Sequence, residues 1–212
     1  MQNAYHLDHP VLEAGVDEAG RGSLLGRMYV GAVIFEKNMN MSNPLNPKLV
    51  KDSKKFTSRT RRKEAYDYIL DNCLSYGIAW CEASDIDDAG LSKSLTRTMH
   101  NAIRALELTP EFLIIDGNYF EPYFHPYRAG FEPVQYQCVA GADNSYYSVA
   151  AASILAKVAH DEYIEEMVEK YPILREYNVH QNMGYGAKQH IEMLKTAGPT
   201  EHHRRSFCSK YI

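Results

Sequence analysis

The chain has 212 residues, of which 45% are hydrophobic and 24% are charged, a composition typical of soluble globular proteins. Its 23 basic and 27 acidic side chains give a formal net charge of −4. This balance argues against a protein that binds polyanions through its overall charge, although it allows a local basic groove.

Neither the cysteines nor the N-terminus indicates an exported or membrane protein. The cysteines at positions 73, 81, 138 and 208 form no CxxC pair and no zinc-binding spacing, so we expect reduced thiols. The stretch MQNAYHLDHPVLEAG has neither the basic nor the apolar region of a signal peptide. No segment approaches the ~20 apolar residues that cross a membrane. The sequence therefore predicts a cytoplasmic protein with no membrane partner.

The first half of the chain is expected to consist mainly of β-strands. Alternating hydrophobicity and β-branched residues indicate the strands, and Gly, Pro and Asn mark the turns. In chain order we predict a strand at 11–16, a turn at 20–27, a strand at 28–36, a loop at 37–48, a helix from about Ser58, and a strand at 75–84.

The second half adds the longer helices. In chain order we predict a helix at 92–106, strands at 111–116 and 131–141, a helix at 146–171, and a helix at 187–198. Strands followed by alternating helices and strands favour an α/β fold with a mixed β-sheet flanked by helices. We place residues 1–172 in this domain and expect residues 173–212 to form a helical segment packed on it.

Acidic residues occur at three places that share one context, since each follows an apolar segment or precedes a helix. Asp17 and Glu18 end the first predicted strand, Asp116 ends FLIID, and Asp143 stands before the alanine-rich helix. Acids at strand ends in an α/β sheet converge on one crevice. Carboxylate oxygens suit Mg²⁺ or Mn²⁺, and two such ions can activate water and stabilise the leaving oxygen in phosphodiester cleavage.

Each of these acids also has a simpler interpretation. Asp143 could cap the helix that follows it, because aspartate is a preferred N-cap residue. Asp116 could be a turn residue before Gly117, and Asp17 and Glu18 could be solvated. The functional interpretation depends on the four occurring together with the strings described below.

Helix geometry separates Asp143 from Asp161, which flanks the same long helix. The two are 18 positions apart, or about 27 Å along a continuous helix, so they cannot share one metal site. We assign Asp143 to the site and Asp161 to an ion pair with Lys157, four residues earlier. Glu18 joins the site only if its strand ends or bulges there, because neighbouring strand residues point to opposite faces.

Four further strings are candidates for contact with nucleic acid. The glycines around Arg21 leave backbone N–H groups open to a partner, and they do not have dinucleotide-binding spacing. DSKK at 52–55 suits a phosphate clamp, although lysine pairs are commonly solvated. SRTRRK at 58–63 places cations at a helix start, against the helix dipole, which suggests a contact with DNA phosphate. Tyr185, between two glycines, suits packing on a nucleic-acid sugar, or else is a buried turn residue.

Together these strings resemble ribonuclease HII, the type 2 ribonuclease H family. GVDEAGRG, DSKK, IIDGN, SVAAASILAKVAHDEY and NMGYGAKQH occur in the family's order, from about Gly15 to His190. The resemblance implies a ribonuclease-H-like fold and a Mg²⁺- or Mn²⁺-dependent endonuclease. Such an enzyme cuts RNA in RNA/DNA hybrids and nicks duplex DNA on the 5′ side of an embedded ribonucleotide, leaving a 3′-hydroxyl and a 5′-phosphate.

The same resemblance implies roles for individual residues. The metal-binding acids, which would hold two ions during catalysis, are Asp17, Glu18, Asp116 and Asp143. The substrate contacts are Gly20, Arg21 and Gly22 at the ribose 2′-hydroxyl, Tyr185 at the RNA–DNA junction, and Ser53, Lys54 and Lys55 on backbone phosphate. The expected partners are RNA/DNA hybrid and ribonucleotide-containing duplex DNA, and we expect a monomer. The C-terminal SFCSKYI is too weak a match to predict a sliding-clamp peptide.

Several positions depart from the family pattern, and none removes an expected metal ligand. SLLGR at 23–27 replaces a segment close to PLAGP, so Arg27 adds a cation near the site. Gly141 and Ala142 replace a Lys-Gly pair before the fourth acid, which removes a positive charge. DSKKF replaces DSKKL, and His160 stands where arginine is common.

Two alternative functions stay open. A different ribonuclease-H-like nuclease, such as a DNA resolvase or integrase, would cut a duplex without ribonucleotides equally well. A catalytically silent binding module would bind hybrids without metal and would tolerate loss of Asp116. An aspartyl phosphatase is disfavoured because the one DxD string, at 85–87, does not follow an apolar strand.

Overall fold

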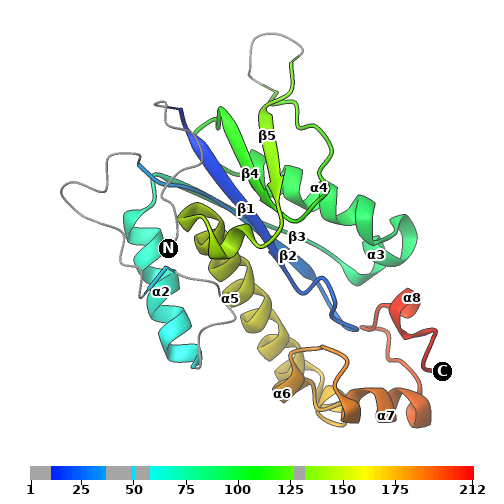
Figure 1. The fold of residues 1–212 in the computed structure, drawn as a ribbon. Coiled ribbons are helices and arrows are strands. Elements are labelled where there is room, and N and C mark those ends of the chain that lie inside the picture. Colours follow the sequence, from blue (N-terminus) through cyan, green and yellow to red (C-terminus); the bar gives the residue numbers. More distant parts are fainter. Residues whose placement is uncertain (1–10, 37–48, 51–57, 127–131) are drawn as a thin grey trace.

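A five-stranded mixed β-sheet forms the centre of the computed structural model, which describes residues 11–36, 49–50, 58–126 and 132–212 (Figure 1). The strand order is β3-β2-β1-β4-β5. β2 pairs antiparallel with β1 and β3, whereas β4 pairs parallel with β1 and β5. The strands are β1 (Glu13–Ala19), β2 (Met28–Ile34), β3 (Ser75–Cys81), β4 (Phe112–Asp116) and β5 (Gln135–Val139). The predicted mixed sheet flanked by helices is therefore confirmed.

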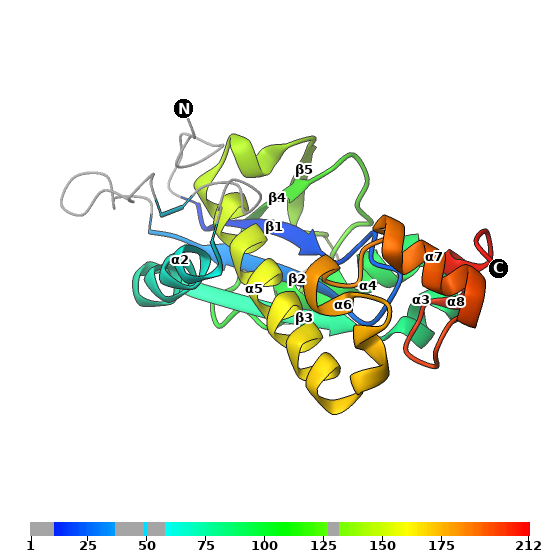
Figure 2. The same cartoon turned by 90° about the horizontal axis from the view of Figure 1, so that it is seen from below.

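Helix α5 (Tyr147–Lys170) covers one face of the sheet and packs directly on β1 and β2 (Figure 2). Two glycines make this close approach possible. A Cβ atom on Gly15 would lie 2.3 Å from the carbonyl carbon of Ser148, and one on Gly31 would lie 2.4 Å from the carbonyl oxygen of Ala152. The alanine-rich run 148–156 of α5 is buried throughout. Helix and sheet therefore pack nearly backbone to backbone.

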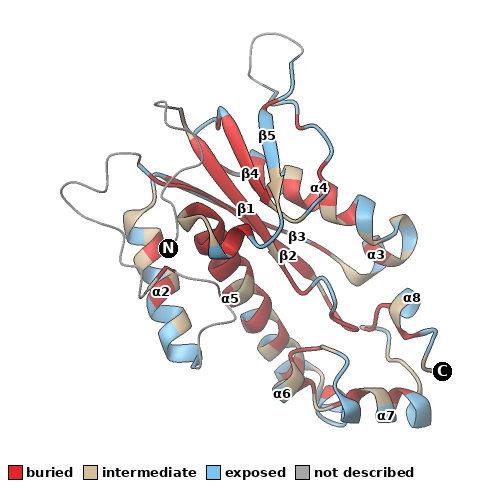
Figure 3. Cartoon of the chain, viewed as in Figure 1, coloured by how far each residue is buried: buried red, intermediate tan, exposed pale blue. Residues whose placement is uncertain are grey.

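Helices α3 (Ala83–Ala89) and α4 (Leu91–Arg104) lie on the opposite side, where α4 packs on β1, β2 and β3. The principal hydrophobic core lies between α4 and the sheet. Figure 3 shows how the buried residues gather on the strands and on the flanking helices. The buried members of this core include Val16, Val30, Met99, Ile103 and Ile115.

The C-terminal segment packs against the turn between β1 and β2 and the end of α5. Isolated β-bridges join Ser23 to Tyr185 and Leu25 to His203. A shared hydrophobic cluster includes Leu24, Ile164, Val168, Leu174 and Leu194. The elements of this segment are η3 (Pro172–Arg175), α6 (Val179–Asn182), α7 (Lys188–Ala197) and α8 (Arg205–Cys208). The 20–27 turn is therefore enclosed by residues more than 150 positions further along the chain.

The predicted third strand extends too far. Instead of continuing to 84, β3 ends at Cys81, because Glu82 and Asp85 form a reciprocal capping box that starts α3. The predicted strand at 131–141 is also shorter, since β5 spans only Gln135–Val139. In both places hydrophobic and polar residues continue to alternate beyond the end of the strand, so the sequence pattern does not mark where the strand ends.

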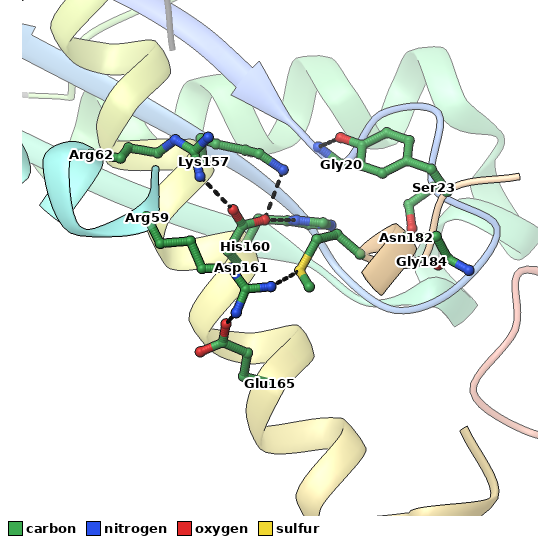
Figure 4. A network of polar contacts seen from close by, with 12 residues as sticks. Gly20, Ser23, Arg59, Arg62, Lys157, His160, Asp161, Glu165, Asn182 and Gly184 are labelled. Atoms are coloured by element: carbon green, nitrogen blue, oxygen red, sulfur yellow. Dashed lines mark hydrogen bonds and ion pairs between the residues drawn. The ribbon is translucent and has the colours of Figure 1, made fainter. Parts of the chain in front are cut away.

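Helix α2 (Arg59–Asn72) carries the SRTRRK cations and packs against α5. Most of these cations are ion-paired, and Figure 4 shows the pairs of Arg59 and Arg62. Arg62 Nη1 lies 3.0 Å from Asp161 Oδ2, Arg59 pairs with Glu165, and Lys63 pairs with Glu162. The interpretation of these three side chains as DNA-phosphate contacts is therefore not supported: their charges join two helices.

Asp161 is the centre of this network, and its predicted pair with Lys157 is confirmed at 2.7 Å. Burial acts to raise the pKa of Asp161, but the hydrogen bond from His160 and the charge of Lys157 outweigh it and lower that pKa. We expect Asp161→Asn to lower the free energy of unfolding by about 2 kcal/mol at pH 7, because Arg62 and Lys157 lose their shared carboxylate.

Urea unfolding of wild type and Asp161→Asn across pH checks this. A carboxyl with a lowered folded pKa stabilises the protein above its unfolded pKa of about 3.9 and loses this effect as the pH falls. The difference between the two proteins should therefore shrink below about pH 4. Equal stability at pH 7 would contradict the assignment.

Candidate active site

Asp17 and Asp116 lie beside each other near the carboxyl ends of two parallel strands. β1 and β4 pair in register up to Val16 opposite Ile115, so the next residue of each strand reaches the same level. Asp17 is buried and Asp116 is partly exposed. This is the crevice position expected of acids that follow apolar strands.

Glu18 reaches this region without the strand end that was expected. β1 does not stop at Val16 but continues to Ala19, because its last three residues pair with β2. Successive side chains therefore lie on opposite faces. Asp17 lies on the α5 face and is hydrogen-bonded by Ser153, whereas Glu18 Oε1 lies 3.4 Å from Nη1 of Arg21.

The three carboxyls nevertheless form one electrostatic group. Burial raises the pKa of Asp17 well above its ordinary value, and the charges of Glu18 and Asp116 raise it further. Burial also raises the pKa of Glu18, and Asp116 adds to this effect while Arg21 opposes it. Such mutual repulsion in a buried place favours the arrival of a positive charge.

Asp143 lies in the short turn η2 (Ala142–Asn144), directly before α5, and is 2% exposed. The backbone N–H of Ala142 donates to Asp116 Oδ1 at 2.8 Å, which ties this turn to the end of β4. Gly141 has a φ of 71°, a left-handed conformation that favours glycine. The turn that contains Gly141 and Ala142 therefore links the third and fourth acids.

The chemistry of these side chains fits a hard divalent cation, because four carboxylates supply only oxygen donors and three of them repel one another. As the side chains are placed, no group of three or more His, Cys, Asp or Glu residues in the described ranges is arranged to hold an ion. Glu18 instead pairs with Arg21. The acids thus share a charge environment but not a closed coordination shell.

The turn that follows β1 lies against Tyr185, although the two are 165 positions apart (Figure 4). The N–H of Gly20 donates to the Tyr185 hydroxyl oxygen at 3.1 Å, and the N–H of Leu24 donates to the carbonyl of Gly184 at 2.8 Å. Arg21 and Gly22 are exposed. The structure therefore brings together the predicted sugar-sensing turn and the predicted stacking tyrosine.

Two departures from the family pattern have structural explanations. Arg27 Nη2 lies 2.7 Å from Glu82 Oε1, and its guanidinium lies over the Trp80 ring, so this cation is held away from the acids. His160 is fully buried, and its ring lies where a Cβ atom on Gly20 would be placed. It therefore packs beneath the turn that follows β1.

Sequence reasoning missed several polar residues that support this region. Ser153 is a lone hydroxyl within an alanine run, and that contrast was an available signal. Arg204 and the pair His190 and His203 gave no signal, because their partners lie far away in sequence. Ser53, Lys54 and Lys55 lie outside the described residues, so their predicted phosphate contact stays a prediction.

A buried chain of hydrogen bonds ends on the Tyr185 backbone. The N–H of Thr200 donates to His203 Nδ1 at 3.0 Å, so the proton of His203 is on Nε2. That Nε2 lies 2.9 Å from His190 Nε2, which therefore accepts, and His190 Nδ1 donates to the Tyr185 carbonyl at 3.0 Å. Each histidine is neutral, with a defined tautomer.

Acid should destabilise the protein through this pair. Burial lowers the pKa of His190, and burial together with the neighbouring histidines lowers that of His203 to about 3. Because the unfolded histidines bind protons below about pH 6.5, the free energy of unfolding should fall as the pH drops from 7 to 5. Each neutral histidine contributes a slope of up to about 1.4 kcal/mol per pH unit.

Burial also lowers the pKa of His160, so acid should destabilise the protein through this residue as well. A variant of His203 is therefore needed to separate the contribution of the His190–His203 pair. His203→Gln should be less stable than wild type at pH 7 but should lose stability less steeply on acidification. Thermal unfolding at half-unit pH steps measures both slopes, and equal slopes would refute the neutral pair.

The chain is similar to known proteins over nearly its whole length. The family model described as Ribonuclease HII matches residues 14–210. A ribonuclease HII of Caldicellulosiruptor bescii is 37% identical over 217 residues, covering 100% of this chain and 96% of the relative. One from Rickettsia typhi is 37% identical over 199 residues, covering 94% of this chain and 92% of the relative. None of the helices in the described ranges has the length and apolar character needed to cross a bilayer.

Solved structures share this fold. The ribonuclease H2 of Pyrococcus horikoshii superposes with a TM-score of 0.71 at 24% identity, covering 94% of this chain and 96% of the other. The PCNA:RNase HII complex of Archaeoglobus fulgidus gives a TM-score of 0.70 at 25% identity, covering 93% and 94%. The chain therefore belongs to the ribonuclease HII family, the metal-dependent endonucleases that cleave RNA in RNA/DNA hybrids.

Proposed function

We propose that this enzyme also nicks duplex DNA on the 5′ side of a single embedded ribonucleotide. The supporting observation is the placement of Asp17 and Glu18 on the same strand end as the turn of Gly20 and Gly22, with Tyr185 against that turn. The residues proposed for chemistry and for sugar recognition are thus separated by one turn of backbone. The scissile phosphate would lie beside the sugar that is inspected.

Asp17, Glu18, Asp116 and Asp143 would hold two divalent ions. When bound, such ions activate water and stabilise the charge that develops on the leaving oxygen. The four carboxyls supply hard oxygen donors, and a hydrogen bond from Ser153 helps to hold Asp17 in place. In the reaction, a water oxygen forms a bond to phosphorus and the bond to the 3′ oxygen of the preceding nucleotide breaks. That oxygen gains a proton, which leaves a 3′-hydroxyl and a 5′-phosphate.

Substrate recognition would fall to the other residues. The backbone of Arg21 and Gly22 is exposed where it could meet the ribose 2′-hydroxyl, and the Tyr185 ring would pack against the adjacent sugar. Ser53, Lys54 and Lys55 would contact backbone phosphate. We propose Mg²⁺ or Mn²⁺ as the metal; the Mn²⁺ complex of a Bst-RNase HIII shares this fold, with a TM-score of 0.60 at 18% identity over 94% of this chain and 65% of the other.

A nicking assay tests the proposal. Three labelled duplexes are compared in Mg²⁺ and in Mn²⁺: DNA with one ribonucleotide, an RNA/DNA hybrid, and DNA alone. We expect cleavage of the first two, a single nick 5′ of the ribonucleotide, and a product that a polymerase extends without prior treatment. Cleavage of the hybrid without the single-ribonucleotide duplex would refute the proposal, and equal cleavage of DNA alone would favour a resolvase-like nuclease.

A further inference from the structure

Arg204 is a fully buried arginine directly behind the turn of Gly20 to Gly22. It stands between α7 and α8, and two backbone contacts bring it there. The bridge between Leu25 and His203 aligns the chains, and the N–H of Arg204 donates to the carbonyl of Leu24 at 2.9 Å. Its position is therefore set by the backbone and not by side-chain packing alone.

Within the described part of the chain, the guanidinium donates hydrogen bonds only to backbone carbonyls of the 20–27 turn. Nη1 donates to the carbonyl oxygen of Gly20 at 2.8 Å and to that of Arg21 at 3.1 Å, and Nε donates to that of Gly26 at 2.9 Å. No carboxylate in the described ranges forms a salt bridge with it. Burial lowers the pKa of Arg204 to about 10, which leaves it charged at neutral pH.

The geometry of the peptide bond means that these contacts also determine the direction of the neighbouring N–H groups. In a trans peptide the C=O and the following N–H point in opposite directions, and the described residues contain no cis peptide. Because the carbonyls of Gly20 and Arg21 point to Arg204, the N–H groups of Arg21 and Gly22 point away from it. Among the described residues neither N–H has a hydrogen-bond partner. Two donors are therefore presented on the side of the turn opposite a buried positive charge.

We propose that Arg204 is a positioning residue for ribonucleotide recognition: it holds two peptide planes so that the N–H groups of Arg21 and Gly22 meet the ribose 2′-hydroxyl and its adjoining phosphate. The inference rests on the proposed single-ribonucleotide function and identifies what orients its recognition element. The guanidinium charge behind the turn, which no direct salt bridge neutralises among the described residues although Asp87 interacts with it over a longer distance, also favours the approach of phosphate. Without Arg204, the Gly20 carbonyl keeps only the hydrogen bond from the Ser23 N–H, at 3.2 Å, and the Arg21 carbonyl loses its Arg204 donor. The two peptide planes are then held less firmly, and the donors lose their common direction.

The test compares the affinity for a single-ribonucleotide duplex with that for the same duplex made of DNA alone. Fluorescence anisotropy in Ca²⁺, at concentrations where no cleavage is detected, gives both dissociation constants. Arg204→Lys keeps the charge but cannot span three carbonyls, and we expect the preference for ribonucleotide to fall about tenfold or more while DNA binding changes little. Arg204→Met should lose the preference and bind both duplexes more weakly.

Arg62→Met is the matched control, because Arg62 is also a largely buried arginine but pairs with Asp161 between α2 and α5. It should lose stability and keep the wild-type preference. If Arg204→Lys keeps that preference, or loses no more of it than Arg62→Met, the inference is wrong. If wild type itself does not prefer the ribonucleotide, the proposed function fails instead.

A measurement on wild type covers the case in which the Arg204 variants do not fold. In ¹⁵N spectra the Arg21 and Gly22 amides should exchange rapidly with solvent in the free protein. They should shift on addition of the ribonucleotide duplex in Ca²⁺, and less with DNA alone. Amides that are strongly protected in the free protein would show that they do not face solvent, which overturns the inference.

Discussion

Replacing Asp17 by asparagine is expected to reduce cleavage of RNA/DNA hybrid by about a thousandfold or more and to raise the thermal stability of the metal-free protein. The first effect follows because Asp17 is proposed as a ligand of the catalytic ions. The second follows because burial and the charges of Glu18 and Asp116 raise its pKa, so its ionised form costs stability at neutral pH. Asparagine has no charge, and its Oδ1 can still accept from Ser153.

The measurement is a melting curve for each protein in chelator and in excess Mg²⁺ or Mn²⁺, together with hydrolysis rates. A ligand that binds only the folded state raises the melting temperature, so wild type should gain stability from the metal and Asp17→Asn should gain less. Asp161→Asn provides the matched control, because it also removes a largely buried aspartate charge but should keep the metal-induced shift. A fully active Asp17→Asn, or one as responsive to metal as wild type, would contradict the assignment.

Replacing Gly15 by alanine is expected to destabilise the fold by about 3 kcal/mol or more. The new Cβ would lie 2.3 Å from both the Ser148 carbonyl carbon and the Val149 nitrogen. Both atoms belong to the backbone of α5, so no side chain can rotate to relieve the clash. The helix would have to move away from β1, and Asp17, two residues along, would lose its contact with Ser153.

Chemical unfolding of purified protein measures this effect, and circular dichroism shows whether the variant folds. Gly22→Ala is the matched control for stability, because a Cβ there meets nothing within 4 Å and the backbone needs no left-handed conformation. Its free energy of unfolding should change by no more than about 0.5 kcal/mol. Similar stabilities for the two variants would show that α5 does not pack on β1 as described.

Local patterns in the sequence were sufficient for most helices and strands. The apolar run FLIID and the long alanine-rich helix were recognisable because their residues share one environment along the element. The end of β1 was not recognisable. Its acidic residues resemble a turn, but pairing with β2 carries the strand through to Ala19, and that pairing is a contact between separate segments.

The candidate site likewise divides into features that local sequence predicts and features that depend on contacts between distant segments. Asp17 and Asp116 could be placed together from sequence, because both were expected at strand ends and the carboxyl ends of parallel strands meet at one edge. The ion pairs of the α2 cations could not be predicted, since a single helix does not reveal that α5 supplies Asp161 and Glu165 as partners. An excess of one charge on a helix indicates that an oppositely charged partner exists, but it does not show whether that partner is another part of the protein or a ligand.

The sequence by itself therefore determined the kinds of elements, the sheet-and-helix architecture and the acids at its strand ends, because these depend on spacing between near neighbours. Only the tertiary structure decided that Tyr185 lies against Gly20, that His203 connects through His190 to Tyr185, and that Arg204 donates hydrogen bonds to the carbonyls of the turn. A buried polar group must find a partner, and packing of distant segments determines which one is within reach.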